Sequence, residues 1–256
     1  MPADATPLAK LSVLVTRPEH QSAGFCKSLQ LAGARTVQLP TIEIVFPPSQ
    51  DEPQLLARYK LLIFTSANAV HGAIRQFSRA WSNAGVLVAA IGPATANALK
   101  QHGIIVDITP AKHNSEGMLK ALSAIDLSGY DVAILRGDSG RNLLIDQLTP
   151  RAASVQHLEL YQRRLPKHAR CDVEQAVQKT NISCVSSDLG LQNLAKLLTP
   201  VQLSAVSSRP LIVNSSRCAA LAKAMGFDNK IRVAAPPGDT GQLQALRECA
   251  ESIPAR

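Results

Sequence analysis

The sequence predicts an α/β protein of two similar lobes, each built on a parallel sheet. Two observations support this prediction. Short runs of Val, Ile and Leu alternate with amphipathic stretches, and the second half of the chain echoes the first at an offset of about 120 residues. Continuous apolar runs are typical of strands buried on both faces, and helices between them supply the crossovers that parallel strands need.

The expected strands are short apolar runs, which lie at 11–15, 61–64, 86–91, 132–135, 183–185 and 211–213. The expected helices have helical spacing of apolar residues, and several end on Gly, a common helix stop; they lie at 24–33, 67–77, 96–103 and 218–226. Segments 40–48 and 157–166 are extended in composition and bounded by prolines, which exclude helix continuation. We therefore predict that these two segments form a paired linker.

The internal echo has four parts in the same order. Arg17 in LVTRP matches Arg136 in ILRGD, and Ser66 in FTSANAV matches Ser187 in VSSDLGL. The other two pairs are segments 91–104 with 213–227, and 116–122 with 240–246. Each half is therefore expected to be one structural unit.

Composition limits the function. The 256 residues are 46% hydrophobic, which predicts a folded globular chain, and the net charge of +8 favours an anionic partner. Aromatic residues are only 4%, so nucleic-acid binding is not favoured. Five cysteines without a CxxC pair and scattered histidines predict neither disulfides nor a metal, and we expect no cofactor. Without a signal-peptide pattern or a run of about 18 apolar residues, we expect a cytoplasmic protein that does not bind membranes.

Hydroxyl side chains follow four of the expected strands, each just before a helix. They are Thr65, Ser66, Thr95, Ser186, Ser187, Ser215 and Ser216. Taken singly, each is an ordinary helix cap. Together they line the carboxyl edges of parallel strands, where free amides and helix dipoles attract anions. Arg17, Arg136 and Arg217 lie beside the same edges and suit carboxylate groups.

Several familiar catalytic motifs are absent from the sequence. It contains no GxxxxGK[ST] or GxGxxG loop for nucleotides, no GxSxG elbow, and no close carboxylate pair. The residues alone therefore predict an anion-binding protein without naming its reaction.

The ordered motifs resemble those of the uroporphyrinogen-III synthase family. They are LVTRP, FTSANAV, IGPATANAL, the stretch at 115–122, LRGDSGRNLL at 135–144 and LYQRR. The resemblance covers nearly the whole chain. It implies two α/β lobes joined by a two-stranded β-ladder, with residues 1–39 and 166–256 forming one lobe and 40–165 the other. It also implies a monomer that needs no cofactor.

The resemblance further implies the substrate and the reaction. Hydroxymethylbilane, a linear tetrapyrrole with eight carboxylates, would lose its hydroxyl and close into a ring with the last pyrrole inverted. Tyr161 matches the family tyrosine that helps the hydroxyl leave, and the seven hydroxyl residues match substrate contacts. Arg17, Arg136 and Arg217, by their charge and position, suit the carboxylates of such a substrate. Two departures weaken the match in the second half: VSSDLGL lacks the aromatic-Thr-Ser form, and Asn214 stands where the first half has Gly92.

Two other functions remain open from the residues alone. The same bilobed layout is expected of a sensor that binds an acidic metabolite without converting it. A basic nucleic-acid binder would instead use the charge cluster at 163–170.

Overall fold

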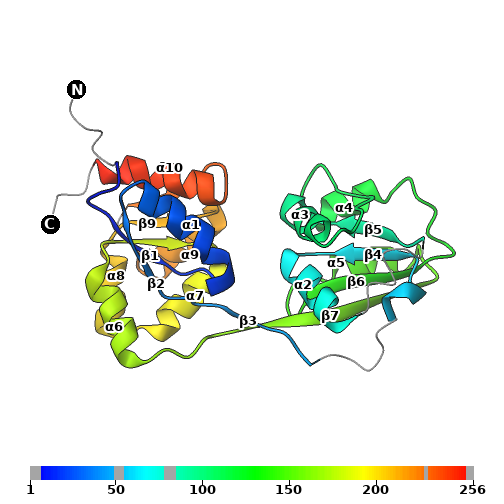
Figure 1. Cartoon of the computed structure of the whole chain (residues 1–256), viewed down its shortest axis with the longest axis horizontal. Helices are drawn as coiled ribbons and strands as arrows, with labels where there is room; N and C mark the ends of the chain where they lie inside the picture. The colour runs from blue at the N-terminus through cyan, green and yellow to red at the C-terminus, as the bar shows by residue number, and fades with distance from the viewer. Residues whose placement is uncertain (1–6, 49–54, 78–84, 228–229, 252–256) are drawn as a thin grey trace. The chain divides into compact units, whose positions relative to one another are not determined.

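A computed structural model describes residues 7–48, 55–77, 85–227 and 230–251. The chain divides into two compact units (Figure 1). Unit 1 is Met1–Glu43 with Arg164–Arg256, and unit 2 is Ile44–Arg163. These boundaries lie within a few residues of the sequence-based division at 39/40 and 165/166.

Unit 1 contains a parallel five-stranded sheet of order β10-β9-β8-β1-β2. Its strands are β1 (Ser12–Val15), β2 (Arg35–Gln38), β8 (Ile182–Val185), β9 (Leu211–Val213) and β10 (Ile231–Val233). Apolar side chains of alternate strand residues point to opposite faces, so the sheet has a core on each side.

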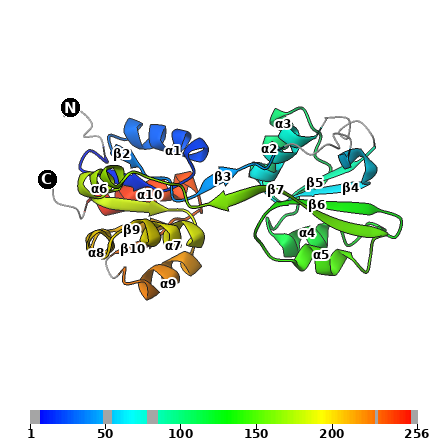
Figure 2. The same cartoon turned by 90° about the horizontal axis from the view of Figure 1, so that it is seen from below.

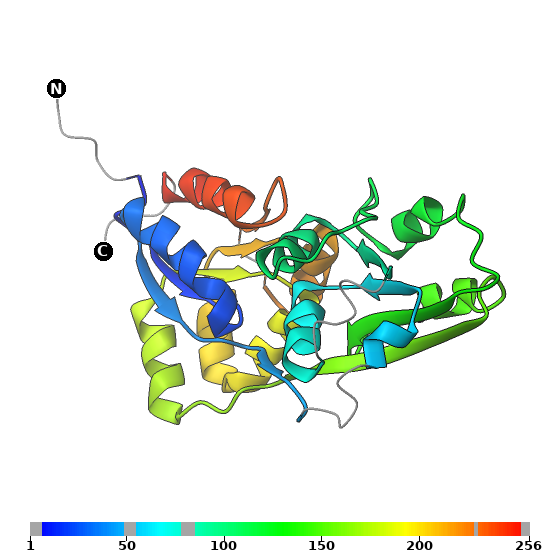
Figure 3. The ribbon, with the colours of Figure 1, turned by 45° about the vertical axis from the view of Figure 1, so that its right-hand side comes forward.

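Helices cover both of these faces. One core is closed by α1 (Glu19–Leu31) and α10 (Asp239–Ala250), which lie side by side in Figure 3 although they come from opposite ends of the chain. The other core is closed by α6 (Arg170–Lys179), α7 (Asp188–Leu197), α8 (Pro200–Ser207) and α9 (Ser216–Ala224). The sheet edge where the strands end is left to loops and helix starts.

Unit 2 contains a second five-stranded sheet, of order β3-β7-β6-β4-β5. Its strands are β3 (Glu43–Val45), β4 (Leu61–Phe64), β5 (Leu87–Ala90), β6 (Asp131–Gly137) and β7 (Ser154–Arg164). Figure 2 shows α2 (Ala67–Gln76) and α3 (Pro93–Gln101) on one face, with α4 (Ser115–Ala121) and α5 (Leu143–Leu148) on the other. A short 3₁₀ helix, Leu55–Arg58, precedes β4.

The two sheets have matching strand orders, as the sequence echo predicts. The neighbours β5-β4-β6-β7 of unit 2 correspond to β9-β8-β1-β2 of unit 1. Next to β5 of unit 2, Ile108 forms a single parallel bridge with Ala89; this bridge takes the place that the pairing of β10 with β9 has in unit 1. The match extends to helix starts: a Cβ on Gly117 of α4 would overlap the Lys112 carbonyl, and one on Gly241 of α10 would overlap the Pro236 carbonyl.

The expected strands and helices are confirmed, with two corrections. The predicted pairing of segments 40–48 and 157–166 is confirmed, since β3 and β7 are neighbours, but segment 157–166 is more than a linker, because β7 runs from Ser154 to Arg164 as a strand of the unit 2 sheet between β6 and β3. The cap positions are also shifted: α3 is capped by Gly92 and α9 by Ser215, so Asn214 is not the counterpart of Gly92.

Candidate active site

A pocket of about 250 Å³ lies at the carboxyl edge of the unit 2 sheet, where β4, β6 and β7 end. All of its lining residues belong to unit 2. They are Thr65, Ser115, Ile134, Arg136, Gly137, Ser139, Gly140, Arg141, Leu144, Ile145, Tyr161 and Arg163. Polar and cationic groups therefore surround a small hollow at the sheet edge where α/β proteins usually bind ligands.

Tyr161 is placed in this pocket by an irregularity in β7. The pairing of β6 with β7 shifts by one residue at Arg136 and Gly137, so that Gly137 lies opposite Tyr161. Such a bulge turns a side chain from its regular direction. The tyrosine ring lies directly on the Gly137 backbone, since a Cβ at Gly137 would be 2.6 Å from Cζ of Tyr161. The ring is thus held in one place.

The Tyr161 hydroxyl is held by two donors. Ser66 Oγ donates to it at 3.1 Å, and Arg163 Nη2 donates to it at 2.8 Å. Tyr161 is only 1% exposed, although it forms part of the pocket wall. The pocket thus contains a buried, oriented phenol, with its oxygen fixed from two sides.

Ser66 and Thr65 reach the site because β4 ends immediately before α2. Ser66 is the N-cap of α2, and its Oγ accepts a bond from Ala69 N at 3.1 Å. Thr65 donates its hydroxyl to the Leu135 carbonyl at 3.0 Å, which ties the end of β4 to β6. The ordinary capping role predicted for Ser66 and its contact with Tyr161 therefore occur together.

Arg136 carries a buried positive charge at the end of β6. Arg136 is only 9% exposed. It donates to Gly140 O at 2.8 Å and to Asn142 Oδ1 at 3.1 Å, with longer bonds to the Gly137 and Arg141 carbonyls. All of these acceptors are neutral. A buried charge without a counterion is costly, so this guanidinium favours an anion in the pocket.

Arg141 differs from Arg136 because Glu116 neutralises it. Both its Nη atoms bond the Glu116 carboxylate, and both side chains are mostly exposed. The hydrogen bonds from Arg141 lower the pKa of Glu116, and the same bonds raise the pKa of Arg141. This ion pair lies at the rim of the pocket. Among the described lining residues, the other two arginines, Arg136 and Arg163, donate their guanidinium bonds to neutral acceptors.

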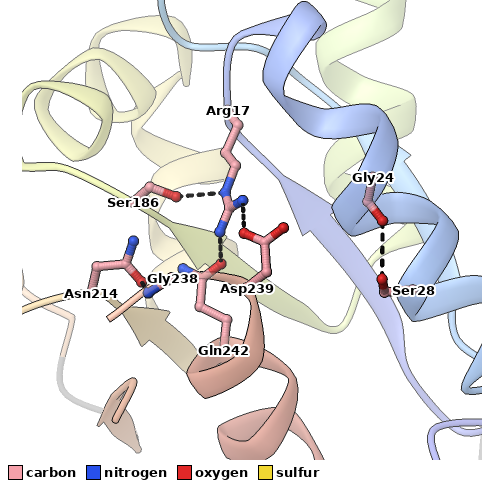
Figure 4. Close-up of polar contacts among 8 residues, drawn as sticks. All are labelled: Arg17, Gly24, Ser28, Ser186, Asn214, Gly238, Asp239 and Gln242. Atoms are coloured by element: carbon pink, nitrogen blue, oxygen red, sulfur yellow. Dashed lines mark hydrogen bonds and ion pairs between the residues drawn. The ribbon is translucent and has the colours of Figure 1, made fainter. Parts of the chain in front are cut away.

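The corresponding arginine of unit 1, Arg17, is bound within the protein (Figure 4). Its Nε donates to Ser186 Oγ at 2.8 Å and its Nη2 to Gln242 Oε1 at 2.6 Å, while Nη1 pairs with Asp239. The guanidinium also lies 4.5 Å from the Phe25 ring centroid. Arg17 and Ser186 thus contact each other and hold α10 against the ends of β1 and β8.

The other sequence-predicted residues of unit 1 lie at helix starts. Ser187 and Ser215 accept bonds at 3.1 Å from the backbone N–H of the third residue after each, and Ser216 is the first residue of α9. Arg217 pairs with Asp188 at 2.7 Å. Burial raises the pKa of the neighbouring Cys218 to about 11, so that thiol stays protonated near neutral pH.

Thr95 was also expected in the site, and it lies elsewhere in unit 2. It is 3% exposed within the first turn of α3 and does not line the pocket. The structure therefore brings Thr65, Ser66, Arg136 and Tyr161 together.

Sequence reasoning did not select Ser115, Ser139 and Arg163. Arg163 carried a usable signal, because it lies two residues after Tyr161 in β7 and such residues share a strand face. In the described ranges, no group of His, Cys, Asp and Glu could hold a metal ion, and no helix is long and apolar enough to span a membrane.

Known proteins match the chain over most of its length. The family model described as Uroporphyrinogen-III synthase HemD matches residues 25–238. The uroporphyrinogen-III synthase of Escherichia coli K12 is 31% identical over 250 residues, covering 93% of this chain and 100% of that protein. A putative uroporphyrinogen-III synthase of Methanothermobacter thermautotrophicus is 32% identical, covering 72% of this chain and 76% of its own.

Solved structures share the fold. The uroporphyrinogen-III synthetase of Helicobacter pylori aligns over 94% of this chain and 99% of its own, with a TM-score of 0.63 and 18% identity. A mutant uroporphyrinogen III synthase of Thermus thermophilus aligns over 95% of this chain and 100% of its own, with a TM-score of 0.60 and 16% identity. From the family model and the sequence relatives together, the chain belongs to the uroporphyrinogen-III synthase family of lyases.

Proposed function

We propose that this chain converts hydroxymethylbilane into uroporphyrinogen III, and that the unit 2 pocket binds the reacting end of the substrate without a cofactor. The main support is the Tyr161 hydroxyl, which is held by Ser66 and Arg163 at the wall of a cationic pocket. This arrangement supports the proposal, because a phenol at the pocket wall can give its proton to a hydroxyl group bound in the pocket.

The charge of the pocket suits this substrate. Hydroxymethylbilane carries eight carboxylates, and Arg136 offers a buried guanidinium whose described acceptors are all neutral. A bond between a charged donor and a carboxylate contributes roughly 1.5–3 kcal/mol. The net charge of +8 also favours the encounter with a polyanion.

The size of the pocket limits what it holds. Its volume of about 250 Å³ is below the range of roughly 300–1,000 Å³ of drug-sized sites. One pyrrole ring with its side chains is the portion of substrate that suits this space. The remaining rings would lie outside the pocket.

The proposed chemistry is acid-assisted loss of water. Tyr161 gives its phenol proton to the substrate hydroxyl, the carbon–oxygen bond breaks, and water leaves while the pyrrole nitrogen lone pair stabilises the carbocation. The α carbon of the last pyrrole that carries the methylene bridge attacks this centre, the bond from that carbon to the bridge breaks, and the bridge carbon bonds to the other α carbon of the same ring, which inverts the ring. The proton released from that second α carbon restores the phenol, so the net change is loss of one water. Arg136, by holding a carboxylate, would favour the geometry that gives ring inversion.

The proposal is tested by product analysis. Freshly generated hydroxymethylbilane is incubated with the protein, and the uroporphyrinogen isomers are separated. We expect uroporphyrinogen III at a rate well above that of the uncatalysed reaction. Formation of only the uninverted isomer at the uncatalysed rate would contradict the proposal, and saturable substrate binding without product would indicate the metabolite sensor instead.

The proposed role of Tyr161 has its own test. Tyr161→Phe should lower kcat by about 100-fold or more, because the proton donor is lost, while thermal stability stays nearly unchanged. Tyr59→Phe is the matched control, since its hydroxyl bonds Gln156 Oε1 at 2.7 Å away from the pocket. Equal losses of folding and activity in Tyr161→Phe would indicate a structural tyrosine.

We also expect the protein to act as a cytoplasmic monomer that does not bind nucleic acid. A single species of about 27 kDa in solution, unchanged by added DNA at low salt, is the expected result.

A further inference from the structure

We propose that Arg163 is a positioning residue for Tyr161, directing the phenol proton of Tyr161 into the pocket. This inference rests on the proposed function, because it assigns Arg163 a part in the same proton transfer. Arg163 lies in the LYQRR motif, but the arginines expected from the sequence to contact substrate do not include it.

The contacts of Arg163 are specific to the phenol. Its Nη2 donates to Tyr161 Oη at 2.8 Å, and its guanidinium carbon lies 5.2 Å from the centroid of the same ring. The other arm of the guanidinium is anchored, since Nη1 donates to Ser139 Oγ at 2.7 Å. Arg163 therefore bonds the tyrosine oxygen through one guanidinium nitrogen, while Ser139 fixes the other.

The backbone of Arg163 is fixed as well. Its N–H points to both carboxylate oxygens of Asp138, at 3.3 and 3.4 Å, and Asp138 N in turn donates to Tyr161 O at 3.0 Å. The Asp138 carboxylate thus accepts from the backbone N–H of Arg163, while the two guanidinium bonds of Arg163 go to the neutral oxygens of Ser139 and Tyr161. The positive charge stays directed at the phenol.

Two donors on one phenol oxygen decide where its own proton points. A phenol oxygen has two lone pairs and one O–H. Arg163 and Ser66 occupy both acceptor positions, and Ser66 Oγ also accepts from Ala69 N. Because a guanidinium can only donate, the Tyr161 proton cannot point at Arg163; with Ser66 donating to the second lone pair, the direction left for that proton is toward the pocket that Tyr161 lines.

The charge of Arg163 also acts on the reaction itself. Negative charge develops on the Tyr161 oxygen as its proton leaves, and a preorganised cation beside that oxygen stabilises the charge. Removing Arg163 should therefore lower the rate of the chemical step and leave substrate binding nearly unchanged.

The first experiment compares two arginines that lie over aromatic rings. Arg163→Met is expected to lower kcat by about tenfold with little change in KM. The control Arg75→Met removes a guanidinium 4.5 Å from the centroid of Phe46, a ring without a hydroxyl, and should leave kcat unchanged. Arg163→Lys retains a cationic donor and should recover part of the loss. A rise in KM at constant kcat would overturn the proposal, because Arg163 would then be a substrate ligand.

The second experiment is a double-mutant cycle. If Arg163 acts through Tyr161, then Arg163→Met has no further effect on kcat in a Tyr161→Phe background. The same tenfold loss in both backgrounds would overturn the proposal. If Arg163→Met fails to fold, Ser139→Ala replaces it in the cycle, since it frees the other arm of the guanidinium; it should lower kcat less, and only when Tyr161 is present.

These results are separable from the proposed function. Absence of uroporphyrinogen III with the wild-type protein contradicts the function itself. With normal wild-type product, additive losses in the cycle contradict only the role of Arg163.

Discussion

The two units place an arginine at the same point of the same scaffold and use it differently. Arg17 lies two residues after the end of β1 and Arg136 is the last residue but one of β6, and these strands are equivalent in the two sheets. Arg17 is neutralised by Asp239 and bonds Gln242, both from α10. The corresponding positions at the start of α4 are Ser115 and Met118, which cannot neutralise a charge. One helix start thus decides which arginine remains open to an anion.

A second difference concerns the strand beside that arginine. In unit 2, β7 carries Tyr161 next to Gly137, and the cap Ser66 reaches its hydroxyl. The equivalent strand of unit 1, β2, ends at Gln38, and the buried polar residue that follows it is Thr41, whose hydroxyl donates to the Thr16 carbonyl. Equal scaffolds therefore carry unequal chemistry, and the phenol belongs to unit 2 alone.

The largest difference expected between the two units is seen when Arg136 and Arg17 are each replaced by Met in separate variants. Arg136→Met should raise KM by about tenfold or more, because a charged bond to a carboxylate is lost. Arg17→Met should leave KM nearly unchanged and lower the free energy of unfolding by about 1–3 kcal/mol, because buried Gln242 loses its partner. Steady-state kinetics and urea unfolding measure the two effects.

The contrast between the two units is tested by which variant changes KM and which changes stability. A rise in KM for Arg17→Met at unchanged stability would mean that unit 1 also holds a carboxylate through its arginine. The matching control is Arg151→Met, since Arg151 donates to the Leu122 and Ile125 carbonyls of unit 2 and does not line the pocket.

Much of this architecture is predictable because burial on both faces leaves a clear pattern. Strands such as LLIF at 61–64 are continuous apolar runs, and the echo of Ser66 in Ser187 follows from equivalent helix starts. Short edge strands gave no such pattern: β2 reads RTVQ and β10 reads IRV, with several exposed residues. Their pairing is decided by neighbours distant in sequence.

The site was less predictable for a related reason. Tyr161 was found through a family motif, but its position depends on a register shift against Gly137, which spacing does not reveal. Arg17 and Arg136 have the same sequence context after a strand, so only the side chains of α10 and α4 distinguish them. Tertiary partners, more than motif residues, separate a ligand contact from a structural bond.

A smaller effect is expected from the equivalent caps. Ser66→Ala and Ser187→Ala each remove a bond to the backbone N–H three residues later, which costs about 1 kcal/mol of stability in both cases. Only Ser66→Ala should also lower kcat, because Ser66 Oγ bonds Tyr161. Thermal unfolding and kcat are measured for both variants. Equal kcat losses would show that capping alone explains the role of Ser66.

The smallest expected effect is on stability and comes from the two ion pairs, Arg141 with Glu116 in unit 2 and Arg17 with Asp239 in unit 1. The Arg141 bond lowers the pKa of Glu116 below its usual value of 4.5, so this carboxylate stabilises the fold above that pH and loses its contribution as the pH falls through the lowered value. Glu116→Gln should therefore be slightly less stable than wild type at pH 7, with the difference shrinking as the pH is lowered from 7 towards 3 and in high salt. Asp239→Asn should cost more at pH 7, because its partner Arg17 is 11% exposed whereas Arg141 is 62% exposed. Urea unfolding at both pH values measures this difference. Equal costs for the two variants would mean that burial of Arg17 adds nothing to its ion pair, and the contrast between the two units would then rest on the proposed anion site of Arg136 alone.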